Sequence, residues 1–242
     1  MQTRFRETLL AISAGFLLQC VTISAVAGTL SASFQPIPSN SIVDLSAEGN
    51  VDWIHWGLAS ATSIDRKASV PPIIESFAPI VVAGGGAMER FDDNFNGYSW
   101  TDGAPTAAAT NSPTGVYVIG KNCGFKLKVP ADTTPRTLKV YVGAFAAKGQ
   151  FSASLIGDSA PAYSDSTIEN VGNGPSGCYT INFAAGSTGQ TLTVTYIVSA
   201  QYDHQYANVT LQAAALSSGA TVSSTKNSTA DGRHAETTAP KP

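Results

Sequence analysis

Apolar and polar residues alternate along much of this chain, which is the pattern of β-strands that bury one face. The alternation is clearest in the segment 114–143, where Phe, Leu and Val at 125–129 are separated by lysines and the pattern returns at 138–142. A turn containing proline joins the two runs. We interpret 124–142 as an antiparallel hairpin. Its apolar face must rest on another layer, which predicts a second sheet stacked on the first.

The same period-two pattern recurs on both sides of this hairpin, and no segment sustains a helical period. The chain is therefore predicted to be all-β, an antiparallel β-sandwich of the jelly-roll kind. Further strands are expected at 30–34, 73–77, 80–83, 151–155, 179–183, 191–198 and 207–214.

Residues 1–27 have the composition of a secretory signal peptide, with Arg4 and Arg6 before an apolar run that ends in Ala25-Val26-Ala27. A lipoprotein signal at Cys20 and an uncleaved anchor are the alternatives. Residues 28–215 are long enough for one β domain, and 216–242, rich in Ser, Thr and Ala, are predicted to be a disordered tail. The mature chain is expected to be secreted, extracellular or periplasmic, without a membrane span.

The charge balance gives no indication of a polyanionic partner. Residues 28–215 hold nine Lys and Arg and fourteen Asp and Glu, a balance of minus five, and contain no basic run. We therefore expect neither nucleic acid nor an anionic membrane as a partner.

Two cysteines, Cys123 and Cys178, follow the predicted signal peptide, and each precedes a predicted strand. An oxidising compartment would allow a disulfide between them, which would stabilise the fold by roughly 3–4 kcal/mol in the chain-entropy model. Two buried free thiols are the alternative.

Enzyme signatures are missing, and we expect neither catalysis nor a cofactor. His55, His204 and His234 are far apart in the sequence, and the letters GNGPSG at 172–177 lack the strand before and the helix after that a dinucleotide site needs. Structural calcium, held by Asp92 and Asp93 or by Asp44 and Glu48, is a less favoured possibility.

A group of aromatic and polar residues in two short segments is the candidate ligand site. Sugar rings stack on Trp and Tyr, while Asp, Arg and His bind their hydroxyls. The alternative is that the rings fill the space between sheets and that Asp52 and Arg66 form a structural ion pair. The candidate residues are Trp53, His55, Trp56, Arg66, Tyr98, Trp100 and Asp102.

Three motifs carry a resemblance to a known type of module: DWIHWG at 52–57, GYSWTDGAP at 97–105 and VPADTTPRTLKVYVG at 129–143. With Arg66-Lys67-Ala68 and YANVTLQA at 206–213, they make the chain resemble a β-sandwich module of secreted bacterial proteins. More loosely, it is similar to galactose-binding-like jelly rolls, which include many carbohydrate-binding modules. The resemblance implies the fold and, less specifically, non-catalytic binding of a polysaccharide or cell-surface glycan. A structural or adhesive protein that associates with itself is the alternative.

Overall fold

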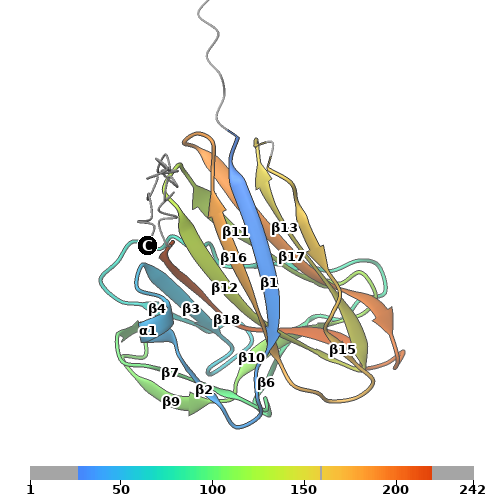
Figure 1. Cartoon of the computed structure of the whole chain (residues 1–242). Helices are drawn as coiled ribbons and strands as arrows, with labels where there is room; N and C mark the ends of the chain where they lie inside the picture. The colour runs from blue at the N-terminus through green and yellow to red at the C-terminus, as the bar shows by residue number, and fades with distance from the viewer. Residues whose placement is uncertain (1–26, 159, 220–242) are drawn as a thin grey trace, which may run out of the picture.

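The computed structural model describes residues 27–158 and 160–219 (Figure 1). The predicted signal peptide, apart from its last residue, and most of the predicted tail lie outside these residues. The last strand continues to Ser218, beyond the expected domain boundary at 215, because Leu216 is fully buried in the core.

Two antiparallel sheets form the body of the molecule, which confirms the predicted β-sandwich. The large sheet has nine strands. Its order is β1 (Thr29–Pro36), β16 (Gly177–Ala184), β12 (Arg136–Phe145), β18 (Asn208–Ser218), β3 (Asp52–Trp56), β4 (Ile64–Lys67) and β8 (Gly103–Ala104), with β10 (Gly115–Ile119) also on β18 and β6 (Met88–Phe91) on β10.

The second sheet has six strands. Its order is β14 (Tyr163–Asp165), β13 (Ala147–Ile156), β17 (Gln190–Gln201), β11 (Gly124–Ala131) and β5 (Ala78–Ile80), with β15 (Glu169–Asn170) also on β13. The main core lies between the two sheets. It consists of the inward-facing residues that alternate along each strand, such as Leu127, Val140, Phe151 and Val194. None of the described residues belongs to a helix long and apolar enough to cross a membrane.

The expected hairpin at 124–142 is wrong in its pairing, although the alternation is correct. β11 pairs with β17 and β5 in the second sheet, whereas β12 pairs with β16 and β18 in the large sheet. Leu127 and Leu138 therefore enter the same core from different sheets. Residues 132–135 cross from one sheet to the other, and an ion pair of 3.0 Å between Arg136 and Asp132 spans this crossing.

The strands expected at 73–77 and 80–83 are also wrong, because the structure has only β5 (Ala78–Ile80) in this region. The backbone N–H groups of Ile73 and Ile74 donate to Asp52 Oδ2, both at 2.8 Å, instead of to a neighbouring strand. A side chain thus holds this segment in an irregular conformation.

A third, smaller layer covers part of the outer face of the large sheet, which the two-layer expectation did not include. It consists of β2 (Ile42–Asp44), β7 (Gly97–Trp100) and β9 (Ala109–Ser112), with the single turn of helix α1 (Leu45–Glu48). Trp53, Trp100 and Tyr141 fill a second core beneath it. All five residues of β3 are consequently buried.

The area of the large sheet that the third layer covers ends where β18 changes the strand with which it pairs. Its C-terminal half pairs with β3 and its N-terminal half with β10, and the register against β12 shifts at Gln212 between the two halves. The outer face of β10 and of the first half of β18 is therefore not under the small sheet. This part of the large sheet lies at the opposite end from Leu30 and Ser218, which belong to one row of paired residues across β1, β16, β12 and β18.

Candidate functional site

The five aromatic candidates from the sequence are all in the interior, with at most 1% of each residue exposed. The rings of Trp53 and Trp100 are 5.4 Å apart, and His55 lies 5.1 Å from Trp100 and 5.6 Å from Tyr98. Trp56 is on the other face of β3 and packs edge-on against Phe77 in the main core. Because none of these rings offers an exposed face, we place the ligand site elsewhere.

Asp102 connects its own segment to three others around the second core. Its Oδ1 accepts from Trp53 Nε1 at 2.9 Å and from Ser46 Oγ at 2.5 Å, and its Oδ2 pairs with Lys67 Nζ at 2.5 Å. Burial opposes ionisation of this carboxyl, but the bonds from Lys67, Ser46 and Trp53 outweigh it and hold the pKa of Asp102 below its usual value. Asp102 is thus a structural connector.

Arg66 and Asp52 do not form the expected ion pair. Arg66 Nη2 donates to the carbonyl of Ile74 at 2.6 Å, and Asp52 accepts from the same segment. Both side chains hold the irregular segment around residue 74, and neither makes an ion pair among the described residues.

Both cysteines are free, contrary to the expected disulfide. Cys123 belongs to the main core, whereas Cys178 packs against the second core. The large sheet separates the two cores, so the thiols lie on opposite faces of it and cannot meet without moving backbone. Burial raises the pKa of the Cys178 thiol to about 11.

Three of the four carboxylates considered for calcium have other partners among the described residues, and Asp93 is the exception. Asp44 caps α1 by accepting from the N–H of Ser46 at 3.0 Å, Glu48 pairs with Lys139, and Asp92 pairs with Arg90 at 2.9 Å. Within the described residues, no group of three or more His, Cys, Asp or Glu side chains is placed to hold a metal.

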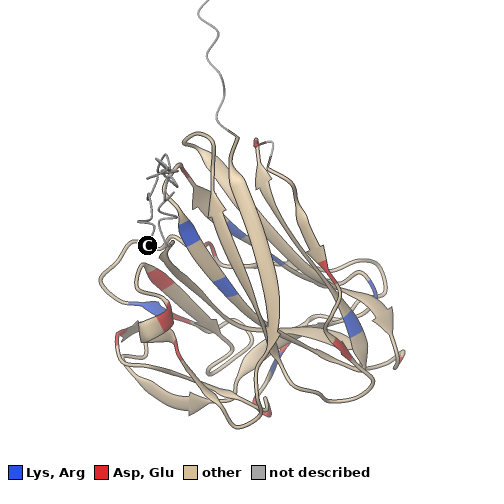
Figure 2. Cartoon of the chain, in the orientation of Figure 1, with Lys and Arg blue, Asp and Glu red and all other residues tan. Residues whose placement is uncertain are grey.

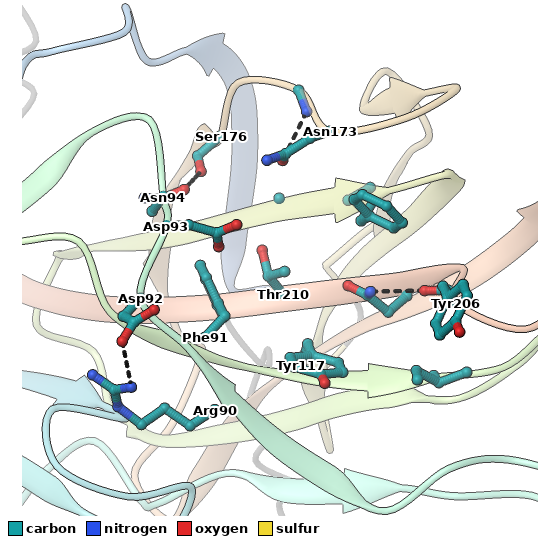
Figure 3. Close-up of a pocket in the computed structure, with 16 residues that line it drawn as sticks. Arg90, Phe91, Asp92, Asp93, Asn94, Tyr117, Asn173, Ser176, Tyr206 and Thr210 are labelled. Atoms are coloured by element: carbon teal, nitrogen blue, oxygen red, sulfur yellow. Dashed lines mark hydrogen bonds and ion pairs between the residues drawn. The ribbon is translucent and has the colours of Figure 1, made fainter. Parts of the chain in front are cut away.

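A pocket of about 390 Å³ lies over the uncovered outer face of the large sheet (Figure 3). Tyr117 and Thr210 belong to its floor, because the residues next to them in β10 and β18 point into the main core. Two loops, 92–94 and 173–176, form walls of the pocket. Its lining residues are Arg90, Phe91, Asp92, Asp93, Asn94, Tyr117, Ile119, Gly143, Ala144, Phe145, Asn173, Gly174, Ser176, Tyr206, Asn208 and Thr210.

β12 and β18 pack closely in the floor at Gly143 and Thr210. A Cβ atom at Gly143 would lie 2.7 Å from Thr210 Oγ1, so a larger residue there would displace the floor. Next to it, Tyr117 OH donates to Glu89 Oε2 at 2.5 Å. This bond, together with partial burial, raises the pKa of Tyr117 to about 12. The Tyr117 ring is thereby held in a fixed position on the floor.

Hydrogen bonds connect the walls to the rest of the fold. Ser176 Oγ donates to Asn94 Oδ1 at 2.7 Å and links the two loops, while Asn94 Nδ2 donates to the carbonyl of Asn96 at 3.0 Å. Arg90 Nε donates to the carbonyl of Gly57 at 2.8 Å. The walls are therefore fixed in place without a ligand.

Tyr206 and Asp93 are two of the accessible groups of this pocket, and Asp92 and Asn173 are exposed as well. Tyr206 is 52% exposed. The Asp93 side chain points into the pocket in Figure 3, and it makes no ion pair or hydrogen bond with another described side chain. An accessible ring beside an accessible carboxylate can bind a ligand that has both an apolar face and polar groups.

Along the ribbon in Figure 2, acidic and basic positions are scattered among uncharged ones. Sequence reasoning found only Asp92 and Asp93 among the lining residues, and for calcium rather than for this pocket. The GNGPSG stretch at 172–177, rejected as a dinucleotide site, supplies Asn173 and Ser176 to the pocket wall.

No family model matches the sequence, and no curated protein is significantly similar to it. Solved structures share the β-sandwich layout at low similarity. The CBM22-1 xylan-binding domain of Paenibacillus barcinonensis Xyn10C is 11% identical over 67% of this chain and 90% of that chain, with a TM-score of 0.37. TmCBM61, solved with β-1,4-galactotriose, is 10% identical over 59% of this chain and 88% of that chain, with a TM-score of 0.35.

A third neighbour is the enzymatically active domain of tailspike protein 4 from bacteriophage CBA120. It is 8% identical and has a TM-score of 0.38 over 58% of this chain and 19% of that chain. The chain therefore spans about a fifth of the tailspike domain. These similarities concern the fold alone.

Proposed function

We propose that this protein is a secreted, non-catalytic glycan-binding module and that the pocket on the outer face of the large sheet holds the sugar. The observation that carries the proposal is the pocket's composition. Four aromatic rings, from Phe91, Tyr117, Phe145 and Tyr206, stand beside carboxylate and amide side chains in one concave surface.

The chemistry of a sugar fits this mixture. The C–H face of a pyranose packs on an aromatic ring, and its hydroxyls exchange hydrogen bonds with carboxylates and amides. The volume of about 390 Å³ lies in the range of small-molecule sites and suits a short stretch of a polysaccharide. Because the walls are already fixed by hydrogen bonds, binding would cost little ordering of the protein.

Affinity electrophoresis through gels that contain soluble polysaccharides tests the proposal. The wild type should be retarded by at least one of them, and Tyr206→Ala should bind roughly tenfold more weakly, as expected for loss of an aromatic anchor. Tyr202→Ala is the matched control, because Tyr202 is also exposed but does not line the pocket. Equal retardation of the two variants would contradict the site. Release of reducing ends from the polysaccharide would contradict binding without catalysis.

A structural role through self-association is the second candidate, and the edge strand β1 favours it. Among the described residues β1 pairs only with β16, and none of its eight residues is charged. An uncharged, regular edge strand is open to pairing with another chain. Light scattering should then show dimers that Ser33→Lys returns to monomers. A wild type that stays monomeric at high concentration would exclude this role.

A further inference from the structure

The charge inside the pocket is unequally distributed, and this bears on which sugar it accepts. Its charged lining residues are Arg90, Asp92 and Asp93. Arg90 is already engaged, since it pairs with Asp92 at 2.9 Å and donates to the carbonyl of Gly57. Asp93 is left without a cation among the described residues, so the pocket carries one uncompensated negative charge.

The aromatic rings of the pocket, like Asp93, favour a positively charged ligand. The π face of a Phe or Tyr ring attracts a cation, and the attraction is stronger in a partly desolvated site. Four such rings line a volume of about 390 Å³ together with Asp93. Aromatic faces beside a carboxylate are a common arrangement for binding ammonium groups.

A third observation concerns hydrogen bonding at the wall. Asn208 is only 8% exposed, and its Nδ2 donates to the carbonyl of Tyr206 at 2.8 Å. That bond fixes the orientation of the amide, because a carbonyl can only accept. Asn208 Oδ1 has no donor among the described residues. Because this oxygen is itself buried, it is not open to a ligand in the structure as it stands, and the selectivity of the pocket depends on Asp93 and the rings.

From the uncompensated charge of Asp93 and the aromatic rings around it, we propose that the pocket selects an amino sugar with a free, protonated amino group over neutral and anionic sugars. Asp93 is the residue that determines this specificity, through its charge. The inference rests on the proposed glycan binding and adds the class of sugar. An anionic glycan such as a polyuronide would meet the uncompensated carboxylate and be rejected.

The test compares three oligosaccharides of equal length by titration calorimetry in mildly acidic buffer, with folding checked by circular dichroism. The probes are a glucosamine oligomer, its fully N-acetylated counterpart and a galacturonate oligomer. The wild type should bind the glucosamine oligomer roughly fivefold more tightly than the acetylated one, as expected for a solvent-accessible charge pair with a cation–π contribution. Added salt should reduce this preference.

Two variants, each of which removes one negative charge at a different position, test whether the preference depends on the pocket. Asp93→Asn should reduce the preference to less than about twofold, whereas Glu75→Gln, at an exposed position outside the pocket, should leave it unchanged. Equal affinity for the amino and acetylated oligomers, or tighter binding of the galacturonate oligomer, would overturn this inference while leaving glycan binding intact. If none of the three oligosaccharides binds and no polysaccharide in the gels retards the protein, both this inference and the proposed glycan binding are overturned.

Discussion

His55 should make the fold sensitive to mild acid. The imidazole is fully buried between the rings of Tyr98 and Trp100, and neither of its nitrogens makes a hydrogen bond of normal geometry with a described residue. Burial lowers the pKa of His55 from 6.5 to about 4. The folded protein therefore keeps this ring neutral at a pH where the unfolded chain protonates it.

The direction and size of the effect follow from these two values. Between pH 6.5 and 4 the unfolded state binds more protons than the folded state, so the free energy of unfolding falls as the pH falls. Going from pH 7 to pH 5, the linkage relation gives a loss of about 2 kcal/mol from this one residue, rising to about 3 kcal/mol by pH 4.

Urea unfolding at about pH 7 and pH 5 measures this loss in the wild type, in His55→Phe and in His55→Gln. The difference between the two pH values should be about 2 kcal/mol smaller in both variants than in the wild type, whatever their own stabilities. The exposed His204 provides the control, because His204→Gln should retain the full wild-type difference. If the His55 variants lose as much stability on acidification as the wild type, the reasoning is refuted.

Three further outcomes are expected from the second core and the thiols. Asp102→Ala removes the acceptor of Trp53 Nε1 and the partner of Lys67, and should lower the free energy of unfolding by about 2 kcal/mol and the Tm by roughly 4–8 °C in calorimetry. Trp53→Ala should cost about 3–5 kcal/mol in urea titrations, because it leaves a large cavity in a closed core. Cys123 and Cys178 should both react with a thiol reagent in denaturant without reductant and much more slowly in the native protein; no reaction at either thiol would indicate a disulfide.

The alternation of residues predicted which way side chains face, but not what covers each face. In β3 the period of two puts Trp53 and Trp56 on opposite faces, yet both rings are buried, because the cover over Trp53 comes from β7, more than forty residues later. The same limit explains the misplaced hairpin. Period two defines an apolar face in β11 and in β12, and two such faces can meet across a core as well as side by side in one sheet.

The pocket could not be predicted because its lining residues come from segments far apart in the sequence. Asp93, Asn173 and Tyr206 meet only after β10, β12 and β18 have paired. None of these residues belongs to a motif with fixed spacing. The tryptophan-rich motifs, by contrast, are conspicuous because a core closed on both faces of one strand needs large rings.

The row of residues that joins β1 to β18 has a practical consequence. Leu30 and Ser218 lie on it beside Arg136, while the pocket begins at Gly143, seven residues along β12, or roughly 23 Å away at the rise of a strand. Polypeptide added before residue 27 or after residue 219 starts at the far end of the molecule. A purification tag, a fluorescent partner or a bead can therefore be attached at either terminus, and the mouth of the pocket will still point outward to the solution.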